Sequence, residues 1–391
     1  MNSSETYKKL VVITSRFPYP LEKGDKLRIY QQIKQLSKHF EIHLISTNEH
    51  IVSQAQKDEL NSFCKSIHIF PISPWQKAVG IFWRFFDEKP FQVGYFYHYT
   101  IQRKIDKLLK TIQPDRIYCQ LIRSAEYVKN YHNCPKTIDY MDAFSKGMER
   151  RAKSASLLKR MIFQSEWKRL SSYENSIFEY FEHRTIISEQ DKNYIFHKKK
   201  DTIQIVPNGV DELFFEKENK QKDTDIVFIG NMGYPPNITA VQFLVNNILP
   251  LLPTKTTVKI AGSSPTSEVY KLASDKVEIT GYIDDIRDAY RSARLFVAPM
   301  FLGTGLQNKL LEAMALGIPC ITTSLANNAL GAIPEKMILI ANTPEEFAQQ
   351  IQRLLSDSDL YKSISQSAQD YISQHFTWET TTQKLIDLIR L

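Results

Sequence analysis

Residues 301–319 combine a glycine-rich turn with one lysine and one glutamate at the start of a predicted helix. Gly303 and Gly305 permit a tight turn and a close backbone approach. The free N–H groups at the start of the helix attract negative charge, and Lys309 adds a full positive charge there. Glu312 lies one turn further on. The set suits a phosphate-bearing ligand with a sugar hydroxyl, although an ordinary strand–loop–helix connection with a solvated lysine and glutamate has the same spacing.

The elements around this segment decide where it lies. An apolar run at 294–300 predicts a strand directly before it. Gln307 and Asn308 add hydrogen-bond donors and acceptors at the start of the helix. Because ligands of parallel α/β sheets bind beyond the carboxyl ends of the strands, the segment stands at a suitable place for a ligand.

Short apolar runs alternate with helical stretches along the whole chain, which predicts parallel sheets with crossover helices. A polar stretch at 206–225 that opens with Pro-Asn-Gly predicts a linker between two such halves. We therefore expect two Rossmann-like domains with a cleft between them. The last residues, 376–391, predict a helix that could pack on either domain. The strand-like runs are at 10–15, 41–46, 66–70, 115–119, 136–139, 184–188 and 202–206, and then at 225–230, 257–262, 276–281, 294–299, 319–323 and 337–341.

Composition excludes several classes of protein. With 391 residues, 42% of them hydrophobic and 24% charged, the chain is expected to be globular and to form more than one domain. No apolar run approaches the roughly 20 residues that span a bilayer, and the start lacks the features of a signal peptide. The four cysteines are scattered, so a disulfide framework or a structural zinc site is not expected. We expect a cytoplasmic protein.

Charge is spread unevenly. Residues 1–210 carry an excess of lysine and arginine, and residues 211–391 an excess of aspartate and glutamate, within a net charge of +7. The first half is therefore expected to meet an anionic surface or substrate. Aromatic and basic residues interleave at 74–104, as on helices that lie on membranes, but a core-facing pair of aromatic helices would give the same pattern. The basic helical stretch 149–170 either lines the same face or is simply solvated.

Several stretches, in the same order over essentially the whole chain, resemble the retaining GT-B-fold glycosyltransferases of group 1 (family 4), and most of all members associated with bacterial exopolysaccharides. The resemblance implies an α/β GT-B fold with an acceptor-binding domain at 1–207, a donor-binding domain at 208–374, and a C-terminal helix, 375–391, that packs back on the first domain. The stretches that carry it are 15–46, 137–147, 205–211, 227–244, 279–300 and 301–319.

In that family the glutamate of the LEAMA motif holds the ribose hydroxyls of a nucleotide-sugar donor, which implies this role for Glu312; a carboxylate can accept two hydrogen bonds from a vicinal diol. Lys309 would neutralise the diphosphate. Where many members have a second glutamate, this chain has Thr304, and where many have an arginine and a lysine it has Asn231 and Asn237. The donor-binding set implied by the resemblance is Gly230, Asn231, Tyr282, Gly303, Thr304, Gly305, Gln307, Asn308, Lys309 and Glu312.

For the first domain, the resemblance implies that the loop of Gly24 closes over the donor phosphate and the acceptor. A histidine that many members carry after the fourth strand is missing, and Arg123 stands in that stretch. Asp139 and Asp142 follow a strand that should end near the acceptor. Either carboxylate could hold or assist the acceptor hydroxyl, or cap the next helix. The candidate catalytic residues are thus Gly24, Arg123 and Asp142.

The implied reaction moves a sugar from a nucleoside diphosphate sugar to a saccharide or lipid-linked acceptor with retention, in the synthesis of bacterial surface polysaccharide or glycolipid. We expect no metal, no other cofactor and no nucleic-acid partner, and allow an anionic membrane surface at the inner face of the plasma membrane. Two other functions stay open: a sugar-nucleotide epimerase of the same fold, and a non-catalytic scaffold protein.

Overall fold

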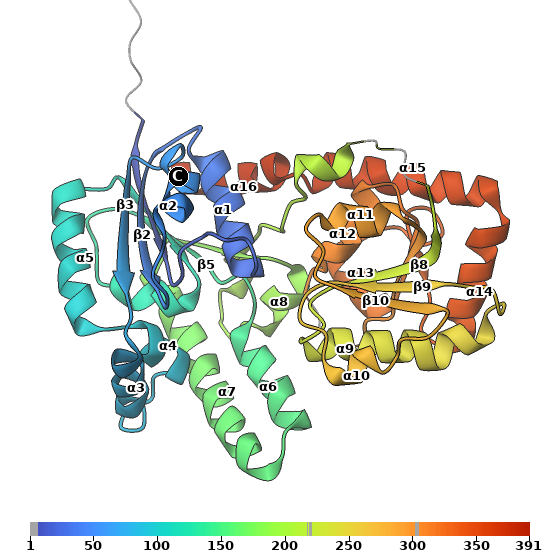
Figure 1. Cartoon of the computed structure of the whole chain (residues 1–391). Coiled ribbons are helices and arrows are strands. Elements are labelled where there is room, and N and C mark those ends of the chain that lie inside the picture. Colours follow the sequence, from blue (N-terminus) through green and yellow to red (C-terminus); the bar gives the residue numbers. More distant parts are fainter. Residues whose placement is uncertain (1–6, 217, 219–220, 302–304) are drawn as a thin grey trace, which may run out of the picture. The chain divides into compact units, whose positions relative to one another are not determined.

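The computed structural model describes residues 7–216, 218, 221–301 and 305–391. The chain divides into two compact units (Figure 1). Unit 1 consists of the described part of Met1–Pro207 together with Thr382–Leu391, and unit 2 consists of the described part of Asn208–Thr381. No helix of the described ranges is both long enough and apolar enough to cross a membrane.

Unit 1 is built on a sheet of seven parallel strands in the order β3-β2-β1-β4-β5-β6-β7. Strand β1 pairs on both sides, since Val11 lies opposite His43 of β2 and opposite Ile117 of β4. The direction in which the chain adds strands reverses between β1 and β4, which makes a topological switch point there. The strands are β1 (Lys9–Thr14), β2 (Glu41–Asn48), β3 (Ser66–Pro71), β4 (Arg116–Gln120), β5 (Lys136–Asp139), β6 (His183–Ile186) and β7 (Gln204–Ile205).

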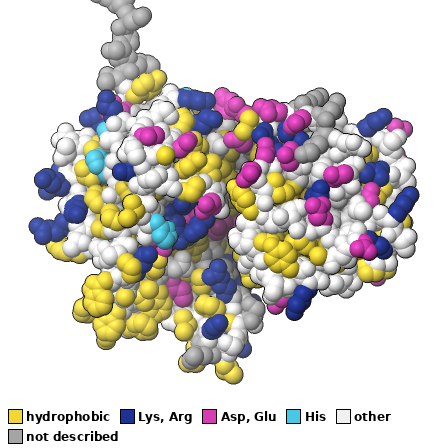
Figure 2. Space-filling model, in the orientation of Figure 1, with side chains coloured by type: hydrophobic (Ala, Val, Ile, Leu, Met, Phe, Trp, Pro, Cys, Tyr) yellow, Lys and Arg dark blue, Asp and Glu magenta, His cyan; other side chains and the backbone are white. Residues whose placement is uncertain are grey.

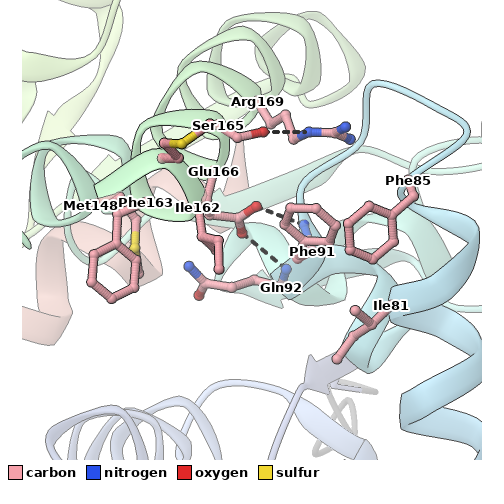
Figure 3. Close-up of a pocket in the computed structure, with 11 residues that line it drawn as sticks. Ile81, Phe85, Phe91, Gln92, Met148, Ile162, Phe163, Ser165, Glu166 and Arg169 are labelled. Carbon is pink, nitrogen blue, oxygen red and sulfur yellow. Dashed lines mark hydrogen bonds between the residues drawn. The ribbon is translucent and has the colours of Figure 1, made fainter. Parts of the chain in front are cut away.

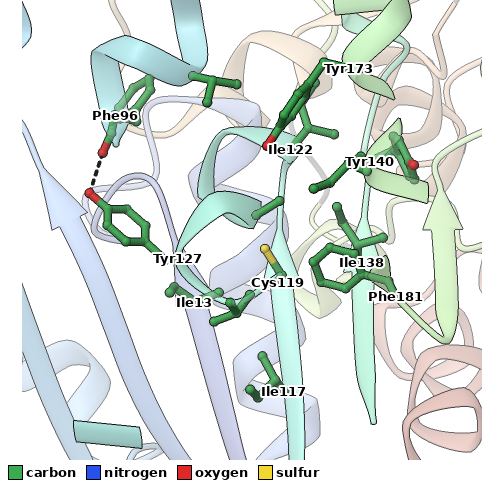
Figure 4. Close-up of a cluster of buried hydrophobic side chains, with 14 of the residues drawn as sticks. Ile13, Phe96, Ile117, Cys119, Ile122, Tyr127, Ile138, Tyr140, Tyr173 and Phe181 are labelled. Atoms are coloured by element: carbon green, nitrogen blue, oxygen red, sulfur yellow. Dashed lines mark hydrogen bonds between the residues drawn. The ribbon is translucent and has the colours of Figure 1, made fainter. Parts of the chain in front are cut away.

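Hydrophobic side chains fill both faces of this sheet because its strands are apolar at consecutive positions. Val11 and Ile13 pack into one cluster of buried side chains, and Leu10 and Val12 pack into the other. Figure 4 shows the first cluster, in which Ile13 lies with apolar side chains from β4 and β5. This double burial fixes the strand ends, and with them the loops that follow.

The helices of unit 1 begin at residues that satisfy their free N–H groups in several places. Ser53 and Ser73 each form a capping box with the glutamine three positions on, which begins α2 and α3. The helices are α1 (Gly24–Leu36), α2 (Gln54–Asn61), α3 (Pro74–Trp83), α4 (Phe91–Phe96), α5 (Tyr99–Ile112), α6 (Phe144–Ser154), α7 (Leu157–Ile177) and α8 (Glu189–Tyr194), with 3-10 turns at Ile122–Tyr127, Phe178–Tyr180 and Lys200–Thr202.

Unit 2 carries a second parallel sheet, of six strands in the order β10-β9-β8-β11-β12-β13. Here the strand order reverses between β8 and β11, so this pair forms the switch point. Phe228 of β8 and Phe296 of β11 stack at 6.3 Å and hold the two strands together from one face. The strands are β8 (Thr224–Ile229), β9 (Val258–Ala261), β10 (Val277–Gly281), β11 (Ala293–Ala298), β12 (Cys320–Thr322) and β13 (Leu339–Ile340).

The last helix, α16 (Trp378–Arg390), begins among the residues of unit 2 and ends among those of unit 1. Leu385, Ile386 and Ile389 pack in the second hydrophobic cluster of unit 1. The other helices of unit 2 are α9 (Pro235–Phe243), α10 (Ser267–Tyr270), α11 (Ile286–Arg291), α12 (Asn308–Ala315), α13 (Ser324–Leu330), α14 (Pro344–Ser356) and α15 (Ser358–His375), with short turns at Glu212–Phe215, Leu244–Ile248 and Leu249–Leu251.

Candidate donor site and acceptor-side cluster

The switch point of unit 2 gathers residues from three places in the sequence. Gly230 follows β8, Met300 follows β11, and Lys309 and Glu312 lie on α12. Gln307 directly precedes α12 and makes no side-chain hydrogen bond that caps it. Among the described residues, the N–H groups of Leu310 and Leu311 bond to the carbonyl oxygen of Gln307, and the positive end of the helix dipole lies at Asn308 and Lys309.

Lys309 is held over the end of β8. Its Nζ donates a hydrogen bond to Oδ1 of Asn237 at 2.5 Å, lies 4.7 Å from the centre of the Phe228 ring, and is 3.9 Å from Sδ of Met300. Burial lowers the pKa of Lys309 to about 7, against a smaller opposite effect of Glu312. A bound anion would raise the pKa of Lys309 and restore its positive charge, because it would add a negative charge beside the buried Nζ.

Glu312 is positioned by a tyrosine. The hydroxyl of Tyr290, on α11, donates to Oε2 of Glu312 at 2.8 Å and lies 3.2 Å from the carbonyl oxygen of Lys309. Burial raises the pKa of Glu312, and Tyr290 and Lys309 lower it in part. The pKa of the buried Tyr290 hydroxyl is raised well above its usual value, so this group acts as a hydrogen-bond donor. One carboxylate oxygen thus has a fixed donor within unit 2.

Gly230 is required by close packing. A Cβ at this position would lie 2.6 Å from Nδ2 of Asn237 and 3.3 Å from Nζ of Lys309. The same backbone is approached from β9, because a Cβ on Gly262 would lie 1.9 Å from the carbonyl oxygen of Gly230. Small residues therefore let the lysine and its asparagine lie against the end of β8.

The remaining predicted donor-site residues divide into three groups. Gln307 donates to the carbonyl oxygen of Gly305 at 2.9 Å, and Asn308 accepts from Asn208 at 3.0 Å, so these side chains shape the start of α12. Asn231 accepts from the N–H of Gly233 at 2.8 Å and is exposed. Tyr282 is 74% exposed and makes no part of the lysine–glutamate arrangement. Gly303 and Thr304 lie outside the described residues.

In unit 1 a charged cluster forms after β1 and β2. Arg16 binds Asp25 at 3.0 Å and Glu49 at 2.9 Å. Glu49 also accepts from the hydroxyl of Tyr95 and lies 3.5 Å from Nζ of Lys77. These partners lower the pKa of Glu49 to about 2 against the effect of its burial. The cluster borders a polar pocket of about 210 Å³ whose lining includes Arg16, Lys23, Lys26, Asn48 and Glu49.

Arg123 lies next to this cluster, at the switch point of unit 1. Its guanidinium packs between the rings of Phe96 and Phe144, 5.3 Å and 4.7 Å from their centres. Its Nε is buried and has no hydrogen-bond partner among the described residues. Burial lowers the pKa of Arg123 to about 10, with a further contribution from Arg16. A guanidinium that is fixed by two rings and has an Nε without a partner among the described residues is suited to an anionic or hydroxyl-rich ligand.

The two candidate aspartates differ sharply. Asp139 forms a buried ion pair with Arg28, at 2.7 Å, and also accepts from Thr185 at 2.9 Å. These bonds give it a structural role. Asp142 has its pKa raised to about 7 by burial and by the nearby Asp191. A carboxyl group that titrates near neutrality can take or give a proton.

Two further expectations concern single residues. Gly24 begins α1, and a Cβ there would meet only Cε of Met141, at 3.7 Å, so its space and backbone do not demand glycine. His98 lies in a tyrosine-rich stretch, where the sequence predicts a surface or packing role; it directly precedes α5, and its Nε2 lies 3.1 Å from the carbonyl oxygen of Tyr95.

The sequence reasoning missed Tyr290 altogether and treated Asn237 only as a missing charge. Neither had a signal of its own, since each acts by holding another side chain across the fold. The roles of Arg16 and Glu49 were missed for the same reason. Within the described ranges, no group of three or more His, Cys, Asp and Glu is arranged to hold a metal ion.

Comparisons with known proteins find a matching family for part of unit 2 and a similar fold for the whole chain. The family described as Glycosyl transferases group 1 matches residues 223–357. A Klebsiella pneumoniae protein described as an uncharacterized 44.6 kDa protein in the cps region is 22% identical over 94% of this chain and 96% of that protein.

Two solved structures resemble the whole chain. Sucrose-phosphate synthase from Thermosynechococcus elongatus has a TM-score of 0.71 at 17% identity and covers 98% of both chains. Anabaena HepE in complex with UDP has a TM-score of 0.67 at 15% identity over 97% of this chain and 98% of that one. The α/β GT-B fold expected from the sequence is confirmed by these likenesses and by the two parallel sheets. The chain thus has the GT-B fold over its whole length, and residues 223–357 of unit 2 match the group 1 glycosyltransferases.

Proposed function

We propose that this chain transfers a sugar from a nucleoside diphosphate sugar to a hydroxyl acceptor with retention of the anomeric configuration. The observation that carries the proposal is the pair on α12, in which Asn237 holds Lys309 and Tyr290 holds Glu312 at the switch point of unit 2. A cation and a carboxylate one helical turn apart match a diphosphate and a vicinal diol.

The donor would lie with its ribose hydroxyls on Glu312 and its diphosphate on Lys309 and the start of α12. HepE, which shares the fold, has been solved with UDP and with UDP-glucose, which supports this class of donor. Since Asn231 and Asn237 stand where family members often have cations, Lys309 carries most of the diphosphate charge among the side chains considered.

The proposed chemistry is charge stabilisation on a leaving group. The bond from the anomeric carbon to the diphosphate oxygen breaks, and the acceptor oxygen forms a bond to the same carbon on the same face. The acceptor proton passes to the leaving phosphate, so no protein nucleophile is needed. Lys309 and the N–H groups of α12 would stabilise the charge that develops on the diphosphate.

The acceptor would be held by unit 1, through Arg123 and Asp142 and with the loop of Gly24. Arg123 brings a buried donor that lacks a protein partner, and Asp142 titrates near neutrality. The relative in a Klebsiella cps region supports an acceptor from surface polysaccharide or glycolipid synthesis. The cytoplasmic location expected from the sequence stays a prediction.

The purified full-length chain should be incubated with a panel of nucleoside diphosphate sugars, with and without candidate acceptors. The proposal predicts release of nucleoside diphosphate together with a product whose new linkage keeps the anomeric configuration. Inversion at that carbon would reject retention alone. An epimerised sugar without acceptor would identify an epimerase, and no turnover with any donor would favour a scaffold protein.

A further inference from the structure

Large apolar side chains gather on one part of unit 1 and face solvent. Five lie on α3 or just after it and three lie on α7, and each is at least 54% exposed. We call this set the apolar surface, and Figure 2 shows hydrophobic side chains gathered over α3. Its members are Trp75, Phe82, Trp83, Phe85, Phe86, Leu157, Met161 and Ile162.

Helix α3 is unusual because it buries none of its residues. Only Gln76 and Lys77 among its ten residues carry polar side chains. A helix of this composition in a globular protein normally turns an apolar face to the core. Here the core-facing interpretation of the aromatic stretch fails for Trp75–Phe86, while Val93 and Phe96 of α4 do enter the core.

Helix α3 is nonetheless held in place by close contacts with α4 and α7. Its backbone crosses that of α4 so closely that a Cβ on Gly80 would lie 2.0 Å from the carbonyl oxygen of Gly94. The guanidinium of Arg169, on α7, donates to the carbonyl oxygens of Arg84 at 2.7 Å and Lys89 at 3.0 Å. The apolar surface is therefore a fixed feature of unit 1 and is held in place from two helices.

A pocket of about 550 Å³ opens between the α3–α4 segment and α6–α7. Figure 3 shows Ile81 and Phe85 on one side of it and Ile162 and Phe163 on the other. The carboxylate of Glu166 at its wall is already bonded to the N–H groups of Phe91 and Gln92, at 2.8 Å and 3.0 Å. Since this carboxylate is satisfied within the chain, the pocket suits an apolar occupant such as a lipid chain.

The segment that contributes α6 and α7 to the apolar surface and its pocket is basic. Residues 144–170 hold eight lysine and arginine residues against two glutamates. Lys159, Arg160 and Lys168 are exposed on α7, the helix that carries Met161 and Ile162. Exposed apolar and aromatic side chains beside basic ones are typical of a surface that enters the headgroup region of an anionic bilayer, where each basic residue adds to the attraction.

We propose that the apolar surface docks unit 1 on an anionic lipid bilayer, with Trp83 and Phe86 among the inserted side chains and Lys159 and Arg160 against the phosphates. The position fits a role beside the acceptor. Helix α3 follows the carboxyl end of β3, and Arg16 and Arg123 follow the carboxyl ends of β1 and β4, so all lie at one edge of the parallel sheet. Lys77 of α3 also contacts Glu49 of the charged cluster.

The test uses the full-length protein and vesicles of phosphatidylcholine alone or mixed with phosphatidylglycerol, without donor or acceptor. Binding is measured by co-sedimentation. Tryptophan quenching by lipids with brominated acyl chains reports insertion, because Trp75 and Trp83 are exposed whereas Trp167 is half-buried and Trp378 is buried. We expect binding to the anionic vesicles only, with quenching that is strongly reduced in the Trp75→Phe/Trp83→Phe protein.

Two variants separate the apolar and the basic contributions. Trp83→Ser/Phe86→Ser and Lys159→Glu/Arg160→Glu should each weaken binding by about tenfold or more. Tyr7→Ser is the matched control, because Tyr7 is 59% exposed and precedes β1, at the opposite edge of the sheet. All four substituted positions are exposed, so the variants should keep the thermal unfolding temperature of the original protein.

Several results would overturn the proposal. One is no binding to anionic vesicles, and another is binding that Trp83→Ser/Phe86→Ser leaves unchanged. A third is a concentration-dependent dimer that the same variant disrupts while vesicle binding is absent, since the apolar surface would then belong to a second copy. The proposed sugar transfer can fail without affecting this test, because vesicle binding is measured without any turnover.

Discussion

The hydroxyl of Tyr290 donates to Oε2 of Glu312 at 2.8 Å, from a helix that precedes β11 to one that follows it. The tyrosine is fully buried, and its hydroxyl also contacts the carbonyl oxygen of Lys309 at 3.2 Å. It therefore fixes the carboxylate relative to the start of α12. Any ligand that Glu312 binds depends on a residue that need not touch the ligand itself.

Tyr290→Phe removes only this hydroxyl and should keep the ring packing against Phe296. We expect kcat/KM for the donor to fall by about 5- to 30-fold, because one hydrogen bond to a charged group is worth roughly 1–2 kcal/mol. Steady-state kinetics with varied donor measures this. In a Glu312→Ala background the same substitution should have little further effect. A full additive loss there would show that Tyr290 acts independently of Glu312.

The pH dependence of donor binding should reflect Lys309. Its pKa of about 7 means that the free site loses its positive charge as the pH rises through 7. Binding of the diphosphate favours the protonated lysine, so affinity should be highest below that pH and fall above it, by at most about tenfold per pH unit for one proton. Titration calorimetry over a range of pH values measures the affinity. The ligand should be a nucleoside diphosphate sugar, because the terminal phosphate of a free nucleoside diphosphate itself titrates near neutrality.

Lys309→Arg provides the comparison for that profile, because a guanidinium keeps its charge over the whole range. The folded variant should bind the donor with an affinity that no longer changes around neutral pH. An unchanged slope in this variant would assign the titration to another group.

Asn237→Asp should weaken the donor site by placing a negative charge beside Lys309. The new carboxylate would raise the pKa of Lys309 and keep it protonated, but its negative charge would offset that of the lysine and repel the diphosphate. Donor affinity should therefore fall by about tenfold or more. Asn246→Asp adds the same charge at an exposed position of unit 2 and should leave the affinity unchanged. Equal losses in both variants would point to a general effect of charge.

The two aspartates at and just after the end of β5 should separate stability from function. Asp139→Asn breaks the buried pair with Arg28 and should lower the free energy of unfolding by about 3–5 kcal/mol. Asp142→Asn should leave the fold nearly as stable and reduce turnover with the natural acceptor. Urea unfolding and kinetics on the same preparations give both readings. A large stability loss for Asp142→Asn would contradict a role at the acceptor.

The positions of many strands along the chain were open to prediction because buried parallel strands are apolar at consecutive positions. The run at 10–15 became β1, Lys9–Thr14, and the run at 225–230 became β8, Thr224–Ile229. Apolar residues from Leu27 to Phe40 recur at helical spacing, which predicts a longer helix than α1, which ends at Leu36. A residue just after a helix can still pack on the core, so its spacing does not mark the end.

The site was predictable where a residue itself carries the chemistry and its spacing is local. Lys309 and Glu312 stand three positions apart on one helix, and the sequence is enough to pair them. Tyr290 and Asn237 lie 22 and 72 positions from their partners, and only the fold brings them together. The difference between Asp139 and Asp142 was likewise hidden, because it depends on Arg28, which is 111 positions away from Asp139.

The donor site proposed on α12 is tested most directly by comparing Glu312→Ala with Glu268→Ala, which removes an exposed glutamate from the same unit. The measurement is release of nucleoside diphosphate from the best donor of the panel, on preparations whose thermal unfolding shows that both are folded. We predict a loss of about 100-fold or more for Glu312→Ala and full activity for Glu268→Ala. Normal turnover by the folded Glu312→Ala protein would contradict the assignment of the donor to this site.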